Sequence, residues 1–333
     1  MVGRGLRRRE WLAFGVGACA CVTGDARTAH ATSQRLFGSF AELHLPSPSA
    51  ALEAEVWREL RTLDAQWNAW KPGEVVELNA ALRRGARAAV APRLAKVLRD
   101  AARLEAVSGG CFNPAIGGLV AAWGFHRDRL DDAAAPTAAW LRRWQAQPRP
   151  SLAALDWRSD RVTSGDARVQ IDLGAIGKGV AADVALELLA REGVREALVN
   201  LGGNVAAMGQ RHGRAWRIGI RDPHHDGLLA VVETRGREAI VTSGTYERRR
   251  IAQGLSVHHL IDPASARPAA ALESVTVVHP CADVADAAAT ALLVAGPLRW
   301  REVARRMNID DVLVVHDDAR VDATATMRVR LGI

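Results

Sequence analysis

The stretch with the clearest chemical potential is IDLGAIGKGVAAD, residues 171–183, which combines two acidic residues, glycines and a lysine. Its glycines let backbone N–H groups come close to an anion. We predict a buried strand before them, over Val169–Leu173, and a helix after them, over Ala181–Ala190. Because the amino-terminal end of a helix is partially positive, this junction predicts a phosphate-binding turn. The structural alternative is a turn whose glycines serve tight packing alone.

Lys178 is the residue of this turn best suited to contact a phosphate. Only three of the 44 basic residues are lysines, so a compact ammonium is unusual in this chain. The turn is no Walker A loop, because Gly179 follows the lysine where Ser or Thr is required. It also lacks the full dinucleotide-binding fingerprint.

Asp286 and Thr290 form a second candidate site, in the segment ADAAAT. On a helix these two side chains share one face. A carboxylate and a hydroxyl, joined by a backbone carbonyl from a glycine turn, form the hard-oxygen site that Mg²⁺ prefers. The alternative is a helix start with an acidic first turn and a threonine facing solvent.

Two further segments carry hydroxyl and imidazole groups. Residues 242–246, TSGTY, include the only tyrosine of the chain, and an ordinary polar hairpin is the alternative reading. His258 and His259 enter a predicted strand that ends in a turn, so alternation sends one ring toward a site and the other away. A neutral histidine there can act as a general base toward a hydroxyl, although a structural histidine is the alternative.

The amino-terminal region, residues 1–31, is predicted to be an export signal. Arg8-Arg9-Glu10-Trp11-Leu12 resembles a twin-arginine signal, and a small-x-small site would allow cleavage before Thr32. Alternatively, the segment ending at Cys19 resembles a lipoprotein box, which would tether the protein to a membrane through that cysteine. Either reading predicts a periplasmic protein, or one at the outer face of the inner membrane, whose domain spans residues 32–333.

Composition narrows the function classes. The 333 residues are 49% apolar, enough for a sizeable core, which excludes a disordered chain. Removing residues 1–31 takes away five arginines and two acidic residues, so the net charge falls from +7 to 39 − 35 = +4. Because the remaining arginines are scattered, we expect no nucleic-acid partner.

Cys111 and Cys281 are predicted to be two separately buried thiols, with a single disulfide as the alternative.

Periodicity predicts an α/β protein. Helices are expected over Ser49–Trp67 and Pro92–Ser108, after a strand over Phe37–Leu45. Residues 127–149 are expected to form a surface helix and loop. From residue 155 onward short strands alternate with turns, which favours an antiparallel or mixed sheet over a doubly wound one. A last helix over Asp283–Ala295 and a closing strand over Asp311–His316 complete the prediction.

Seven short motifs occur in an order that resembles the ApbE family of FAD:protein FMN transferases. The resemblance covers nearly all of residues 36–316, and the motifs are specific as a set although each is weak alone. They are FNPAIGGLV at 112–120, WGF at 123–125, DLGAIGKG at 172–179, NLGGN at 200–204, TSGTY at 242–246, HHLIDP at 258–263 and ADAAAT at 285–290.

This resemblance implies an exported enzyme with a T-fold-like α/β core that uses FAD as substrate and Mg²⁺ as cofactor. It implies transfer of FMN to a Ser or Thr of an acceptor protein, with release of AMP. The implied metal ligands are Asp286, Thr290 and a carbonyl near Gly177. The implied catalytic residues are Lys178, Asp286 and a histidine, for which we favour His259 over His258. The implied cofactor-binding residues are Asn79, Trp70, Asp172, Gly174, Lys178, Asp183, Ser243, Gly244 and Tyr246, with Trp70 stacking on the isoalloxazine.

Four positions depart from the family pattern. Asn113, Asn204 and Thr245 stand where the family usually has Asp, and Ala266 replaces a glycine. The three lost carboxylates lie outside the implied metal ligands but bear on flavin affinity and acceptor choice. They keep two alternatives open: an exported FAD-binding or storage protein without transferase activity, and a Mg²⁺-dependent FAD pyrophosphatase that releases free FMN.

Overall fold

An eight-stranded antiparallel sheet forms the centre of the protein. The computed structural model describes residues 19–21, 30–47, 49–130, 134–252 and 254–333. The strands lie in the order β18-β17-β16-β11-β8-β7-β3-β2, and every neighbouring pair is antiparallel. They are β2 (His30–Leu36), β3 (Ser39–Leu45), β7 (Ala197–Leu201), β8 (Asn204–Met208), β11 (Glu238–Gly244), β16 (Leu272–His279), β17 (Asp311–His316) and β18 (Val321–Ala323).

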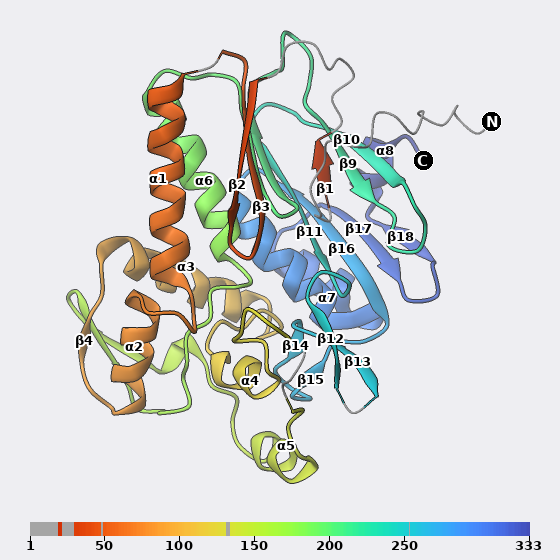
Figure 1. Cartoon of the computed structure of the whole chain (residues 1–333). Helices are drawn as coiled ribbons and strands as arrows, with labels where there is room; N and C mark the ends of the chain where they lie inside the picture. Colours follow the sequence, from red (N-terminus) through yellow and green to blue (C-terminus); the bar gives the residue numbers. More distant parts are fainter. Residues whose placement is uncertain (1–18, 22–29, 48, 131–133, 253) are drawn as a thin grey trace.

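Three long helices cover one face of this sheet (Figure 1). They are α1 (Ala50–Trp67), α6 (Gly177–Arg191) and α7 (Ala282–Arg306). In α1 the residues Val56, Leu60 and Leu63 recur at helical spacing, and all three are buried in the main core between helices and sheet. In α7 the backbone breaks at Gly296, whose φ of 72° precedes Pro297. The predicted end of this helix at residue 295 therefore coincides with a kink.

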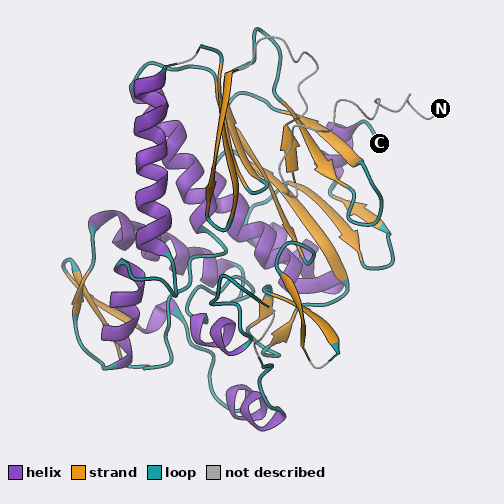
Figure 2. Ribbon diagram, viewed as in Figure 1, coloured by secondary structure: helices purple, strands orange, loops and turns teal. Residues whose placement is uncertain are grey.

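A smaller three-stranded sheet and the last helix pack on the other face, around a second apolar cluster (Figure 2). This layer consists of β1 (Cys19–Cys21), β9 (Arg217–Arg221), β10 (Leu228–Glu233) and α8 (Ala325–Leu331). In the described part of the chain, no helix has the length and apolar character needed to cross a membrane.

The remaining elements form a lobe at one end of the long helices (Figure 1). It contains α2 (Glu74–Arg83), β4 (Ala88–Ala89), α3 (Pro92–Val107), α4 (Gly117–Ala122), α5 (Ala138–Gln145), a 3₁₀ turn (Leu152–Ala154), β5 (Leu155–Arg158), β6 (Arg161–Ser164), β12 (Arg249–Ala252), β13 (Leu255–His258), β14 (Ile261–Asp262) and β15 (Arg267–Pro268). A third apolar cluster, which includes Trp123, Phe125 and Ile261, joins α4 and α5 to β12–β14.

The predicted α/β class with an antiparallel sheet is confirmed, but the predicted strand over Val169–Leu173 is wrong. Only an isolated parallel bridge, between Ile116 and Gln170, occurs there. The side-chain amide of Asn79 takes the place of a neighbouring strand: its Nδ2 donates to the Ile171 carbonyl at 2.8 Å, and its Oδ1 accepts from the Ile171 N–H at 2.6 Å. The apolar residues Val169, Ile171 and Leu173 are buried as expected. The alternation of apolar residues thus predicted their burial correctly, but the strand pairing that it also predicted does not form.

The two cysteines beyond the predicted leader are free thiols. Cys111 is buried as predicted, whereas Cys281 is exposed, so the prediction of two buried thiols is wrong for the second. Cys281 immediately precedes α7, at its N-cap position. The predicted export signal lies mostly outside the described residues and stays a prediction.

A buried histidine on β3 predicts acid sensitivity. The His44 side chain is 5% exposed, and burial together with the positive charge of Arg211 lowers its pKa to about 4. The unfolded chain binds a proton at this ring below its usual pKa of 6.5, whereas the folded protein does so only near pH 4. Stability therefore falls as the pH drops across that window, by about 3 kcal/mol from this group. Urea unfolding at pH 7 and pH 4.5 should show a smaller pH difference for His44→Phe, and an unchanged difference would contradict the assignment.

Candidate active site

The site is organised where the amino-terminal end of α6 meets α7. The N–H of Gly179 donates a hydrogen bond of 2.9 Å to Asp286 Oδ2. A Cβ atom at position 179 would lie 2.3 Å from the Ala282 carbonyl oxygen, so only glycine allows this approach of the two helices. The glycine-rich pattern therefore serves helix packing at this residue, and that packing brings the Asp286 carboxylate to the glycine turn.

Gly179→Ala should accordingly destabilise the protein by about 1–3 kcal/mol, because rigid backbone atoms must move apart to admit the methyl group. Urea unfolding measures this change. Gly165→Ala is the matched control, since a Cβ atom there meets no heavy atom within 4 Å. Equal stability of the two variants would show that α6 and α7 tolerate a wider separation.

Asp286 is a buried carboxylate that lacks a neutralising partner. Its side chain is 3% exposed, and among the described residues no basic group lies within ion-pair distance. Burial raises its pKa, while the charge of Lys178, the Gly179 N–H and the neighbouring Asn204 act in the opposite direction. Such a carboxylate is suited to bind a cation.

Thr290 lies one helical turn beyond Asp286, and it is buried, with 8% exposure, where the alternative reading required a threonine facing solvent. Its hydroxyl is 3.3 Å from Ser243 Oγ, at the end of β11. The structure thus brings Asp286, Thr290, Ser243 and the turn that carries Lys178 together.

The carbonyl groups of the glycine turn differ in availability. Gly177 is the first residue of α6, so its carbonyl oxygen points along the helix axis toward the Ala181 N–H. The carbonyls of Gly174 and Ala175 precede the helix and accept no backbone hydrogen bond among the described residues. In the same residues, no group of three or more His, Cys, Asp or Glu side chains is arranged to hold a metal ion.

Asp172 belongs to a network that the sequence motifs revealed only in part. Its Oδ1 accepts the Gly174 N–H at 2.7 Å, and its Oδ2 lies 2.8 Å from His126 Nε2. Burial would raise the pKa of Asp172, but the His126 contact and the Gly174 N–H outweigh it and lower that pKa. The His126 ring also stacks on Trp70, with ring centroids 5.4 Å apart. Trp70 and Asp172, both predicted, are therefore linked through an unpredicted histidine.

Arg248 is a second residue that the motif comparison missed. Its guanidinium lies 5.3 Å from the centroid of the Trp70 ring and donates to the carbonyls of Phe125 and Arg127 at 2.9 and 3.2 Å. The residue follows the TSGTY segment by two positions, and His126 follows the WGF motif directly. Their closeness in sequence to these motifs was the only feature that could have marked Arg248 and His126 as site residues.

Two predicted cofactor-binding residues have structural partners. The Asn79 amide binds the backbone of Ile171, as described above, and so fixes the residue next to Asp172. The Asp183 carboxylate accepts the N–H groups of Ala282 and Asp283 and contacts Arg237, so it caps the start of α7. These contacts give both residues a structural role beside the site; direct contact with a cofactor stays a prediction for each.

The two adjacent histidines occupy different environments, although β13 ends at His258 and His259 lies in the bend that follows, so strand alternation does not explain the difference. His258 Nε2 donates to the Ala269 carbonyl at 2.9 Å, which ties β13 to the segment after β15. The ring of His259 meets the edge of Phe125, and its Nδ1 is buried without a hydrogen-bond partner among the described residues. Burial and the charges of Arg248 and Lys178 lower the pKa of His259 to about 3. His259 is therefore a neutral imidazole near pH 7.

The loop between β11 and β12 adds two features. A Cβ atom at Gly244 would lie 2.7 Å from the ring of Tyr246, so glycine allows that ring to fold back on the strand end. Glu247 Oε1 is buried and accepts no hydrogen bond within the described part of the chain. Burial raises the pKa of Glu247, and the charges of Lys178 and Arg221 oppose this. No motif had marked Glu247.

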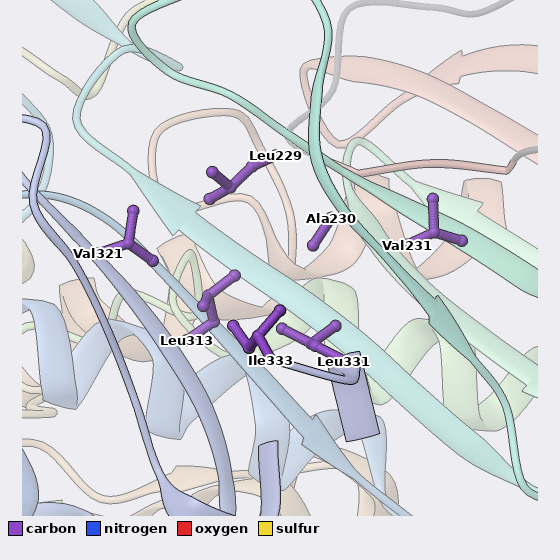
Figure 3. A pocket seen from close by; sticks show the side chains of 7 residues that line it. All are labelled: Leu229, Ala230, Val231, Leu313, Val321, Leu331 and Ile333. Atoms are coloured by element: carbon purple, nitrogen blue, oxygen red, sulfur yellow. The ribbon is translucent and has the colours of Figure 1, made fainter. Parts of the chain in front are cut away.

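A pocket of about 320 Å³ lies elsewhere, between β10, β17, β18 and the carboxyl-terminal residues (Figure 3). All of its lining side chains are aliphatic and carry no group that could bind a phosphate or a metal. The candidate active site is therefore the cluster around Asp286, Lys178, Asp172 and His259, where charged and polar groups converge.

Comparisons with known proteins identify the family of this chain. The ApbE family profile matches residues 36–326. A "FAD:protein FMN transferase" of Rhodobacter capsulatus is 41% identical over 271 residues, which is 81% of this chain; the chain spans about half of that relative, 51%. A protein of the same name from Treponema pallidum is 32% identical over 93% of this chain and 90% of its own length. The solved flavinyl transferase ApbE of Pseudomonas stutzeri superposes with a TM-score of 0.79 at 26% identity, covering 92% of this chain and 97% of that one. The chain belongs to the ApbE family.

Proposed function

We propose that the protein transfers FMN from FAD to a Ser or Thr hydroxyl of an acceptor protein and releases AMP. The observation that carries this proposal is the position of Lys178, whose charge acts both on the buried Asp286 carboxylate and on the neutral His259 ring. One cation thus lies close enough to act on a group suited to hold a metal ion and on a group suited to take a proton. That combination fits phosphoryl transfer to a hydroxyl.

Asp286, Thr290 and a carbonyl of the turn at residues 174–177 would hold Mg²⁺. The fit rests on the buried, unneutralised carboxylate and on a donor set made of hard oxygens only. Because the protein supplies few ligands, substrate phosphate oxygens and water would complete the shell. When bound, the ion would neutralise charge on the pyrophosphate.

The side chains divide the chemical work among them. Lys178 binds the pyrophosphate, and Trp70 offers an aromatic face to the isoalloxazine. Neutral His259 accepts the proton of the acceptor hydroxyl, whose oxygen forms a bond to the phosphorus of the FMN half. The bond from that phosphorus to the bridging oxygen breaks, and AMP leaves with the electron pair. The burial of the Asp286 side chain and of His259 Nδ1 would limit the access of water, which favours the acceptor hydroxyl as nucleophile.

The predicted export signal suggests that the acceptor is met outside the cytoplasm, in the periplasm or at the outer face of the inner membrane. Retention of Cys19 as a lipid attachment site would tether the enzyme there, and cleavage before Thr32 would release it. Mass spectrometry of the protein purified from its host distinguishes the two forms.

The test is incubation of the purified protein with FAD, Mg²⁺ and an acceptor domain that carries a Ser/Thr flavinylation motif. We expect an FMN mass shift on the acceptor and in-gel flavin fluorescence, both lost with EDTA. The acceptor with its Ser or Thr replaced by alanine is the control. Free FMN and AMP without adduct would instead establish a pyrophosphatase, and FAD binding without products would establish storage.

A further inference from the structure

His126 lies where three separate segments of the site meet. Its ring stacks on Trp70, with an angle of 24° between the ring planes, and its Nε2 lies 2.8 Å from Asp172 Oδ2. Trp70 follows α1, and Asp172 precedes the glycine turn. No other contact described above joins the aromatic side of the site to its phosphate-binding side so directly.

The backbone around His126 is held from both sides. Arg248 donates to the carbonyl of Phe125 and to the carbonyl of Arg127, the two residues that flank His126. The same guanidinium lies over the Trp70 ring. The His126 side chain is only 14% exposed and the Asp172 side chain 15%, so the contact between them is shielded from solvent. A hydrogen bond to a shielded carboxylate orients both partners strongly.

We propose that His126 is a positioning residue that sets the separation between the Trp70 ring and the Asp172 carboxylate. This inference rests on the proposed function, in which Trp70 receives the isoalloxazine and the turn after Asp172 receives the pyrophosphate. In a flavin nucleotide the ribityl chain sets an upper limit on the distance between the ring and the phosphates, so a defined separation of the two subsites orders that flexible chain. His126 therefore selects flavin nucleotides over nucleotides that occupy the phosphate-binding turn alone.

The experiment compares the affinities of the full-length protein and its variants for FAD and for ADP, by calorimetry without acceptor. His126→Ala removes both the ring and the hydrogen bond, so FAD should bind about tenfold more weakly. ADP, which lacks the flavin ring, should lose less than about threefold. Quenching of flavin fluorescence, which reports stacking on an aromatic ring, should also decrease for the FAD that binds.

Two conservative variants separate the two contacts of His126. His126→Phe keeps a ring for Trp70, and His126→Gln keeps an N–H donor near the position of Nε2. Each should recover part of the lost FAD affinity, which a generally destabilised protein would not do. His225→Ala is the matched control, because it removes an exposed histidine that pairs with Asp222 outside this network, and it should bind FAD as the wild type does.

Wild-type FAD affinity in His126→Ala, or equal losses for FAD and ADP, would overturn this inference and leave the proposed function intact. Failure of the wild-type protein to bind FAD would overturn the proposed function, and this inference with it. A loss for FAD that exceeds the loss for ADP, together with partial recovery in the conservative variants, would establish the positioning role.

Discussion

Replacing Asp286 with alanine should lower the rate of FMN transfer by about a thousandfold or more. The carboxylate is the only acidic ligand in the proposed metal site, and the transferred phosphoryl group carries charge that a bound ion must neutralise. Asp286 also accepts the Gly179 N–H, so its removal leaves that donor unpaired at the start of α6. Two effects therefore lower the rate of transfer in Asp286→Ala: the metal ion is lost, and the glycine turn loses a contact that orders it.

Two further variants separate these effects. Asp286→Asn keeps an oxygen that can accept the Gly179 N–H but removes the charge, so it should lose activity without losing stability. Asp283→Asn is the matched control, since it neutralises a carboxylate in the first turn of the same helix and should retain transfer. The measurements are the initial rate of acceptor flavinylation over a range of Mg²⁺ concentrations and the urea unfolding curve. Transfer by Asp286→Ala at the wild-type rate would refute the metal assignment.

The parts of this site that could be predicted from the sequence are those set by local geometry. The spacing of Asp286 and Thr290 needs only a helix to place both side chains on one face, and both are buried on α7 as that reading required. The different environments of His258 and His259 were also expected, but β13 ends at His258, so they arise from the end of the strand and not from alternation along it. The helix that was predicted to start at Ala181, after the glycines, instead starts at Gly177, so the pattern located α6 but placed its start four residues too late.

The parts that could not be predicted depend on contacts between distant segments. Asn79 pairs with the backbone of Ile171, 92 residues away, and Asp183 caps α7 across 99 residues. A sequence pattern does not distinguish such supporting roles from direct contact with a ligand. His126 and Arg248 were missed for the same reason, because their importance arises only when their loops meet over Trp70.

Three of the four departures from the family pattern, at Asn113, Thr245 and Ala266, have local explanations in the fold, whereas Asn204 Nδ2 is buried without a hydrogen-bond partner among the described residues. Asn113 bridges the Pro150 carbonyl and the Ala115 N–H, and Thr245 donates to Glu273. Both polar side chains are thus satisfied within the protein, and neither leaves an unfilled position in the cluster. Ala266 has a φ of 57°, a left-handed conformation that explains why glycine is usual there.

Replacing His259 with glutamine should lower the rate of transfer by a factor of about 10² to 10⁴, while FAD affinity changes little. The ring is neutral near pH 7 because burial and two nearby cations lower its pKa to about 3. The base is then already in its active form, so protonation of this group should not reduce the rate between pH 5 and pH 8. A base with so low a pKa does not deprotonate a free hydroxyl. It accepts the proton only as the hydroxyl oxygen bonds to phosphorus, because the O–H group then becomes much more acidic and the negative charge moves to the departing AMP.

His258→Gln is the comparison that decides between the two histidines. The His258 ring holds the Ala269 carbonyl, so its loss should affect stability more than the rate of transfer. Rates measured from pH 5 to pH 8, with FAD affinity measured in parallel, separate binding from chemistry. If His258→Gln abolishes transfer and His259→Gln retains it, the base is His258, and the pKa argument for His259 fails. If both variants transfer at the wild-type rate, the acceptor hydroxyl loses its proton to another group. Glu247, whose buried Oε1 has no hydrogen-bond partner among the described residues, is then the next residue to replace.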